Sequence, residues 1–500
     1  MRPGKRVHRT LCGRIARRTF LSDIGMGFTG LALGAMLHRD GFLRAESAAE
    51  TAWSPPSGVS AFAPRAKSVI WIFLSGGYSH IETFDPKPAL NKYAGKTFAE
   101  TPFENPADNP LLTKRSRSVI QQERKVFKKI FPMQIGFRKQ GESGIEVTDW
   151  WPNLATCIDD ISFVRNMYTT DNDHAAENQI HTGRHKLDEI QPSIGGWLTY
   201  GLGSLNDNLP QFVVLGGPTR ADTAVSFGSY YLGPQHAGVP LSLDPNDPLP
   251  YGRRGIDVLA EEQRNEFELI GRLNRIAAVE YPADEVILAR IRSYELAFGM
   301  QRAVPEAVNL AHETKQTQQL YGLNAKVTQM AGERCLAARR LIERGVRFVQ
   351  VYPTQYGKWD SHTELRKNHS TQSARVDKPV AGLLTDLKRR GLLDETVVVF
   401  CTEFGRTPAV EDRNGNGGKG GRDHHPHGFT VWFAGAGIKR GFVHGATDEL
   451  GFHAVEPGHY VTDIHATLLH LLGLNPAELD IPGRKRIDVD RGSPIEEILV

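Results

Sequence analysis

The sequence has few cysteines, no marked excess of charge of either sign and no long apolar run. Its four cysteines in 500 residues are widely spaced, so neither a disulfide framework nor a cysteine-based zinc site is expected. The 60 Lys and Arg residues nearly balance the 57 Asp and Glu residues, which argues against the basic surface of a nucleic-acid-binding protein. The first 49 residues hold nine basic and three acidic side chains, so the remainder is slightly acidic. We expect no nucleic-acid partner.

The N-terminus has the features of an export leader. Ala16-Arg-Arg-Thr-Phe-Leu21 precedes a weakly apolar, glycine-rich run from Ile24 to Leu37. This pattern resembles a twin-arginine signal, and the run is short for a membrane span, which needs about 20 residues. A short anchoring helix is the alternative. We expect the twin-arginine export machinery to recognise residues 1–49 and the mature chain, with no transmembrane segment, to be periplasmic or secreted.

Continuous apolar runs predict strands that are buried on both faces. They lie at 68–74, 161–165, 212–215, 347–352, 396–401 and 429–434. Helical patterns separate several of these runs, at about 259–298, 305–344 and 373–390. Strands that alternate with helices of this length pair in parallel through right-handed crossovers. The predicted fold is α/β, with a central, mostly parallel sheet flanked by helices.

The same pattern predicts one large domain. After a Pro/Ser/Ala linker at 50–66, this domain spans 67–484 with a polar insertion at about 89–147, and 485–500 forms a C-terminal tail. A glycine-rich loop around Lys419 is not a phosphate-binding Walker loop, because Gly420 stands where Ser or Thr is required.

Histidine and carboxylate side chains gather directly after the predicted strands. In an open parallel sheet, ligands bind beyond the carboxyl ends of the strands. Each cluster alone is more often a turn or a helix cap, as Asp463 illustrates, but together they occupy one place in the topology. Borderline cations such as Zn²⁺ and Mn²⁺ prefer mixed imidazole and carboxylate ligands. A divalent metal site is therefore expected at this edge.

Five motifs support a resemblance to a known family. They are Ser75-Gly-Gly-Tyr-Ser-His-Ile-Glu-Thr-Phe-Asp-Pro-Lys-Pro88, Lys358-Trp-Asp-Ser-His362, Thr402-Glu-Phe-Gly-Arg-Thr-Pro408, Gly421-Arg-Asp-His424 and Asp463-Ile-His-Ala-Thr-Leu-Leu-His-Leu-Leu-Gly473. In this order they resemble the sulfatase-like family called domain of unknown function 1501, a branch of the alkaline phosphatase superfamily. The resemblance implies the fold of that superfamily and a metal site at the strand ends.

The resemblance also implies a ligand set. Asp360 and His362 match an Asp and His that hold one ion. Glu403 takes the place of an Asp whose partner His is replaced by Phe404. The metal ligands implied in this way are Asp360, His362, Glu403, Asp423, His424 and His465, with His80 or Asp85 replacing the Asp that normally ends the first strand. They would hold one or two ions, Zn²⁺ or Mn²⁺ in preference to Ca²⁺.

The expected nucleophile differs from that of sulfatases. Thr182-Gly-Arg184 resembles the end of the sulfatase motif, but Asp173-His174 stands where the modified Cys or Ser would be. Formylglycine chemistry is therefore not expected, and metal-activated water is the predicted nucleophile. His174 would act as ligand, base or phosphorus nucleophile, and Arg184 and Arg406 would pair with the nonbridging oxygens of the ester. Alternatively, His174 fills the pocket wall and Arg406 is a structural ion-pair partner.

These inferences predict an exported, metal-dependent hydrolase of phosphate or sulfate esters. Its substrate would be a small or polymeric anionic ester, such as a sulfated polysaccharide. The alternative is a catalytically silent member of the fold that binds anionic glycans or a cell-surface partner. A serine hydrolase using Ser79 and His80 is a third interpretation, but Gly77-Tyr-Ser-His-Ile81 lacks the second glycine of a nucleophile elbow.

Overall fold

A computed structural model describes most of residues 61–500. The described residues are 61–115, 128–217, 225–244, 247–249, 260–280, 296–297, 299–301, 303–412, 419–455, 457–476, 479, 481 and 492–500. The predicted leader at 1–49 and most of the linker lie outside these ranges. No helix within the described ranges is both long and apolar enough to cross a bilayer.

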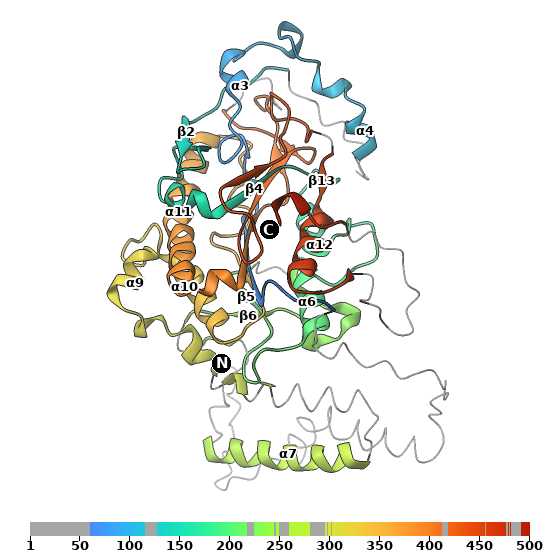
Figure 1. Ribbon diagram of the computed structural model, residues 1–500, viewed down its shortest axis with the longest axis vertical. Coiled ribbons are helices and arrows are strands. Elements are labelled where there is room, and N and C mark those ends of the chain that lie inside the picture. The colour runs from blue at the N-terminus through green and yellow to red at the C-terminus, as the bar shows by residue number, and fades with distance from the viewer. Residues whose placement is uncertain are drawn as a thin grey trace, which may run out of the picture. The chain divides into compact units, whose positions relative to one another are not determined.

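A nine-stranded sheet forms the centre of the described chain (Figure 1). Its strands follow the order β12 (Phe442–His444), β4 (Ile161–Tyr168), β11 (Phe429–Gly435), β8 (Thr396–Cys401), β1 (Ser68–Phe73), β7 (Phe348–Val351), β5 (Phe212–Leu215) and β6 (Val239–Leu241), and β13 (His459–Tyr460) also pairs with β4. Strand β11 runs antiparallel to both of its neighbours, and the other pairings in this sheet are parallel. The predicted α/β fold with a mostly parallel sheet is confirmed.

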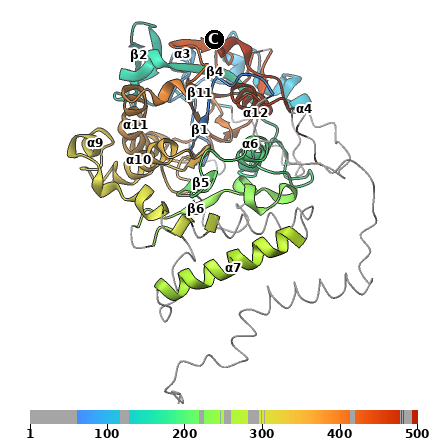
Figure 2. The ribbon, with the colours of Figure 1, turned by 60° about the horizontal axis from the view of Figure 1, so that its bottom comes forward.

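Helices cover both faces of this sheet. Helices α10 (Gln329–Glu343) and α11 (Leu365–Arg389) lie on one side, and α6 (Ile194–Leu202) and α12 (Val461–Leu471) lie on the other (Figures 1 and 2). All six residues of β1 are buried. Because both faces of the sheet are covered, the central strands are continuously apolar and do not alternate with polar residues. These continuous apolar runs allowed the strands to be predicted from the sequence.

The helices differ from the sequence prediction in their bounds. Helix α7 (Ala260–Glu280) occupies the first part of the pattern at 259–298, and most of the rest lies outside the described residues. The pattern at 305–344 contains a helical segment that ends at residue 308, followed by α9 (Lys315–Leu320) and α10. The chain turns between α9 and α10 at Gly322, which has a φ of +74°. Helix α11 begins eight residues before the predicted start at 373.

Short elements complete the described chain. The insertion contains α3 (Pro88–Lys92), α4 (Leu111–Arg115) and a hairpin of β2 (Phe137–Gln140) and β3 (Ile145–Thr148). At the other end of the chain, residues 492–500 pack against the domain, since the amide of Lys439 donates to the carbonyl of Ile498 at 2.8 Å. Residues 492–500, which the sequence predicts as part of a C-terminal tail, therefore pack against the domain.

The stability of this core should depend on pH because it contains neutral histidines. His181 lies against Phe73 and Trp71, and burial, followed by the nearby His465, lowers its pKa to about 3. An unfolded histidine has a pKa of about 6.5. Between these values the unfolded chain binds a proton that the folded chain does not, so stability is lost as the pH falls below about 6.5.

We predict that His181→Gln flattens the pH dependence of the free energy of unfolding between about pH 6 and 4. The removed proton uptake corresponds to at most about 1.4 kcal/mol per pH unit. Urea unfolding at a series of pH values measures this slope, with the exposed His470 as a control, changed to Gln. A slope in His181→Gln equal to that of the unchanged protein would contradict the prediction.

Candidate metal centre

Loops from several strands meet at one edge of the sheet. His174 follows β4 and directly precedes α5 (Ala176–Thr182), and Asp360 follows β7. Asp423 and His424 precede β11, and His424 lies in the two-residue strand β10 (His424–His425), which pairs with β9 (Gly405–Arg406). Because β11 is antiparallel, its amino end lies where its neighbours have their carboxyl ends. Residues from both kinds of strand end therefore converge.

The carboxylate of Asp360 lies at the centre of this group. Its Oδ2 is 3.3 Å from Nε2 of His174. Its Oδ1 is 3.1 Å from Nε2 of His424 and 3.1 Å from Nε2 of His362. Burial alone would raise the pKa of Asp360, but the hydrogen bonds from these three imidazoles lower it far below its usual range. The carboxylate is therefore negatively charged.

His174 is held between two carboxylates. Its Nδ1 lies 3.1 Å from Oε1 of Glu403, which also accepts the amide of Gly76 at 2.8 Å. Burial lowers the pKa of His174, but the hydrogen bonds to Asp360 and Glu403 outweigh this and raise it to about 10. In the absence of an ion the ring is protonated, and a bound cation would displace the proton on the ligating nitrogen.

His424 has a defined ligand atom. Its Nδ1 lies 2.9 Å from the carbonyl of Asn172, which fixes the proton on Nδ1 and leaves the lone pair of Nε2 for a ligand. Two potential metal-binding groups share this residue, one with His174 and Asp360 and the other with His362 and Asp423. Since one lone pair binds one ion, His424 can belong to only one of these groups at a time.

His362 has acidic partners on its other nitrogen. Nδ1 lies 2.5 Å from Oε2 of Glu411 and 3.7 Å from Oδ1 of Asp423. Burial opposes protonation, but the hydrogen bonds to Asp360 and Glu411 raise the pKa of His362. Carboxylates behind a metal-ligating histidine orient the ring and increase its basicity, and Glu411 has the position for this role.

The donor set fits a borderline divalent cation. Within each of the two groups the ligand atoms lie within 4.8 Å of one another, and the nitrogen–oxygen distances around Asp360 are 3.1–3.3 Å. A tetrahedral ion with bonds of about 2.1 Å separates its ligands by about 3.4 Å. The imidazole and carboxylate groups could therefore hold a divalent cation.

The buried side chain of Arg406 holds the carboxylate of Asp360 in place. Its guanidinium has no exposed surface and donates to Oδ1 of Asp360 at 2.8 Å. It also donates to the carbonyls of Gly76, Gly77 and Arg422. This burial places Arg406 as a positioning group for the carboxylate and for the loop after β1, which is the structural alternative that the sequence left open beside direct pairing with the ester.

Comparison with known proteins identifies the family. A family model described as "Protein of unknown function (DUF1501)" matches residues 66–499. The chain belongs to this family. No functionally curated protein matches the sequence.

The solved structures similar to this DUF1501 protein include members of the alkaline phosphatase superfamily. A lipoteichoic acid synthase from Listeria monocytogenes is 9% identical over 86% of this chain and 76% of its own, with a TM-score of 0.36. A superfamily protein from Vibrio parahaemolyticus is 11% identical over 86% and 72%, with a TM-score of 0.35. The alkaline phosphatase of the Antarctic bacterium TAB5 is 12% identical over 83% and 100%, with a TM-score of 0.32. At these TM-scores the likenesses say nothing about the chemistry of the DUF1501 site.

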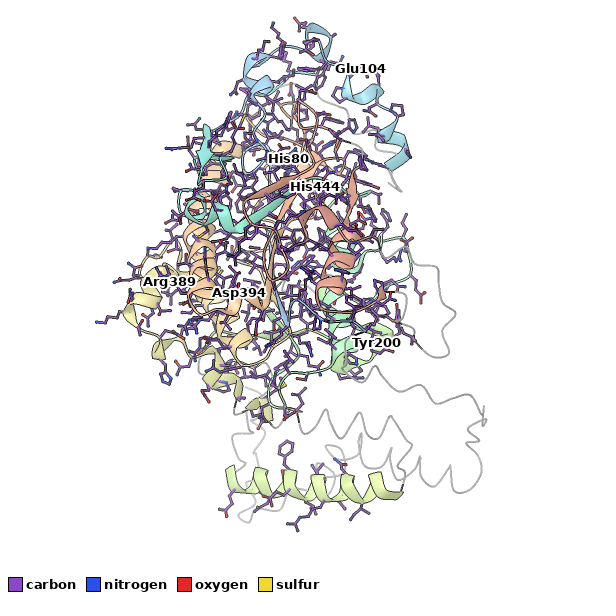
Figure 3. The ribbon with its side chains drawn as sticks, in the orientation of Figure 1. His80, Glu104, Tyr200, Arg389, Asp394 and His444 are labelled. Atoms are coloured by element: carbon purple, nitrogen blue, oxygen red, sulfur yellow. The ribbon has the colours of Figure 1, made fainter. Side chains whose placement is uncertain are left out.

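Four predicted site residues of this DUF1501 chain lie outside the centre. His80, which is labelled in Figure 3, is buried. Its Nε2 faces the carbonyl of Gly451 at 2.9 Å. Asp85 forms an ion pair with Lys87 at 2.9 Å. His465 and Arg184 line a separate cavity of about 50 Å³. The structure therefore does not bring His80, Asp85 or His465 to Asp360.

His465 was included in the predicted ligand set because its Asp-x-His motif resembles that of the late histidine ligand in the superfamily. It lies more than one turn into α12, where its Nε2 faces the carbonyl of Ile180 at 2.8 Å. Burial lowers the pKa of His465 to about 4. Because α12 leads away from the edge of the sheet, its second turn, which contains His465, lies away from the metal centre. The Asp-x-His motif at the start of α12 therefore does not indicate a metal ligand.

Two acidic residues near the centre, Glu411 and Glu177, were not predicted from the sequence. Glu411 contacts His362, as described above. Glu177 accepts from Ser75 Oγ at 3.2 Å, and burial together with the charge of Glu403 raises its pKa to about 8. Glu177 follows His174 at a spacing of three, which was the available sequence signal.

Glu82, one of the carboxylates that follow the first strand in the sequence, forms a fully buried ion pair with Arg422. The shortest contact, between Oε1 and the guanidinium, is 2.7 Å. Arg422 directly precedes Asp423, and its guanidinium also donates to the carbonyls of Phe131 and Pro132 in the insertion. This pair therefore anchors both the ligand-bearing loop and the insertion.

We predict that Asp360→Asn and His424→Gln each weaken binding of Zn²⁺ or Mn²⁺ to this DUF1501 protein by at least about tenfold, because each removes a ligand of the centre. His465→Gln and His80→Gln should leave affinity at this centre unchanged. Equilibrium dialysis with elemental analysis measures the affinities, and circular dichroism verifies folding. Equal losses in His424→Gln and His465→Gln would contradict the assigned ligand set.

Proposed function

We propose that this protein is a metal-dependent hydrolase of phosphate or sulfate esters. The observation that supports it is the convergence of three imidazole Nε2 atoms on the carboxylate of Asp360 at the carboxyl edge of the sheet. This edge is where open α/β sheets bind their substrates. The candidate ions are Zn²⁺ and Mn²⁺.

A bound ion would supply Lewis acidity and lower the pKa of water towards about 7. The residues of the chain have positioning roles. Arg406 holds Asp360, Glu403 fixes the proton of His174 on Nδ1, and the carbonyl of Asn172 does the same for His424. Each imidazole then presents Nε2 to the centre, where it can ligate an ion or accept a proton.

Water is the proposed nucleophile because nearby hydroxyl groups are engaged elsewhere. Oγ1 of Thr169 donates to Oε1 of Gln179 at 2.6 Å, and Nε2 of Gln179 donates to Oγ1 of Thr170 at 2.6 Å. Both hydroxyls therefore contact Gln179, within α5. Direct attack by water predicts inversion at phosphorus or sulfur, without a covalent intermediate.

The centre is accessible from solvent, and an arginine in a separate cavity supports an anionic substrate. The side chain of His174 is 32% exposed and that of Asp360 is 27% exposed, so a ligand can reach the centre from solvent. Arg184 lines the separate cavity with Trp197 and Tyr231, where it would pair with an anionic group further along a polymer.

The test is hydrolysis of a panel of aryl phosphates and aryl sulfates by the metal-loaded protein. His174→Gln should lower kcat by about 10²-fold or more, the effect expected for a lost proton-transfer group or ligand. His470→Gln, on the exposed face of α12, should leave kcat unchanged. Chelation should abolish turnover and Zn²⁺ or Mn²⁺ should restore it. Metal bound at the Asp360 centre without turnover of any ester would overturn the hydrolase and favour a silent glycan-binding protein.

We further propose that the protein is exported by the twin-arginine route. The support is the leader sequence, since residues 1–49 lie outside the described structure. Arg17→Lys combined with Arg18→Lys should retain the precursor in the cytoplasm, because the machinery recognises the paired guanidinium groups. Fractionation of cells producing either form measures the outcome. Undiminished export of the double variant would exclude this route.

A further inference from the structure

A second cluster of potential ligands lies at an outer edge of the sheet and shares no residue with the Asp360 centre. It contains His444 of β12 (labelled in Figure 3), His459 of β13 and Glu497 of the 3₁₀-helix η10 (Glu496–Ile498). Their ligand atoms lie within 4.8 Å of one another. We propose that this cluster binds one divalent cation of the Zn²⁺ class and fastens residues 492–500 to the sheet.

The backbone brings the two histidines together. β12 and β13 pair with successive parts of β4, so that His444 lies opposite Val164 and His459 opposite Met167. The chain between β12 and β13 leaves the sheet and returns to the same edge of β4. Its return point, Met167, is three residues beyond Val164, or about 10 Å along β4. The imidazoles span this interval, and their Nε2 atoms are 2.9 Å apart.

Asp463 sets the ligand atom of His459. Its Oδ2 lies 2.8 Å from Nδ1 of His459, so Nδ1 carries the proton and Nε2 has a lone pair directed at His444. A carboxylate behind a histidine in this way is the usual support of a metal ligand. The other oxygen of Asp463 accepts the amide of Ser493 at 3.0 Å, which links the same carboxylate to the C-terminal segment.

The third ligand comes from that segment. Oε2 of Glu497 is 3.9 Å from Nε2 of His444, and its side chain is 51% exposed, whereas that of His444 is 16% exposed. The two imidazoles and the carboxylate would supply three ligands to Zn²⁺. A water molecule on the solvent side would be the fourth ligand. Glu497 needs to move only slightly, because a Zn²⁺ ion separates its ligands by about 3.4 Å.

The charges around the cluster also favour a cation. Glu497 and Asp463 are the acidic groups that face it. Lys439 is the neighbouring cation, and its Nζ donates to the backbone carbonyl of Glu497 at 2.7 Å. The carboxylates of Glu497 and Asp463 therefore favour a cation at this cluster, and the ammonium group of Lys439 opposes it. Without an ion, Nε2–H of His444 would simply donate to Nε2 of His459, and the test must separate these two states.

The test measures Zn²⁺ bound to the full-length protein and hydrogen exchange of residues 494–500. The unchanged protein should bind one equivalent more than His444→Gln, and Zn²⁺ should slow exchange in this segment only when the site is intact. Glu497→Gln should weaken this equivalent by at least about tenfold, and Asp463→Asn by about tenfold. Glu496→Gln, at the adjacent exposed position of the same 3₁₀-helix, is the matched control and should change neither quantity.

Glu497→Gln keeps the proposal testable if His444→Gln fails to fold, because the side chain of Glu497 is half exposed. Unchanged Zn²⁺ stoichiometry and affinity in Glu497→Gln would show that the histidines form only a hydrogen bond and would overturn the site. Zn²⁺ binding at this site without slower exchange of 494–500 would overturn its fastening role. Neither readout uses catalytic activity, so the outcome is separate from the fate of the proposed hydrolase.

Discussion

The candidate centre depends on the antiparallel pairing of β11 between β4 and β8. The other strands of this sheet run parallel and deliver their following loops to one edge. A parallel β11 of seven residues would place its preceding loop at the opposite edge, about 20 Å away. The reversal brings Asp423 and His424 beside Asp360, so one strand direction decides whether the ligands can meet.

The second requirement is compensation of charge around Asp360. A partly buried carboxylate is costly unless its oxygens are paired. Here three imidazoles and the Arg406 guanidinium surround it, and Glu403 and Glu411 balance the imidazoles from behind. The arrangement is thus organised before any ion binds, which reduces the reorganisation that metal binding would require.

The sequence was most informative where local pattern and burial coincide. Continuous apolar runs identified the buried strands, and the rule that ligands follow such strands found His174, Asp360 and His424. His465 shows the limit of a motif, because Asp-x-His does not reveal that the histidine lies in a helix leading away from the edge. Glu411 had no local pattern at all. It reaches His362 across 49 positions through a contact that only the tertiary fold creates.

The buried Glu82–Arg422 pair also limits how the sequence can change. The two residues are 340 positions apart, and neither side chain has any exposed surface. Loss of one partner would leave an uncompensated buried charge, which typically costs about 3–5 kcal/mol. Replacement of both by apolar residues of similar volume is often tolerated. Relatives should therefore keep both residues or lose both, and a statistical covariation between these two distant columns is expected in the family.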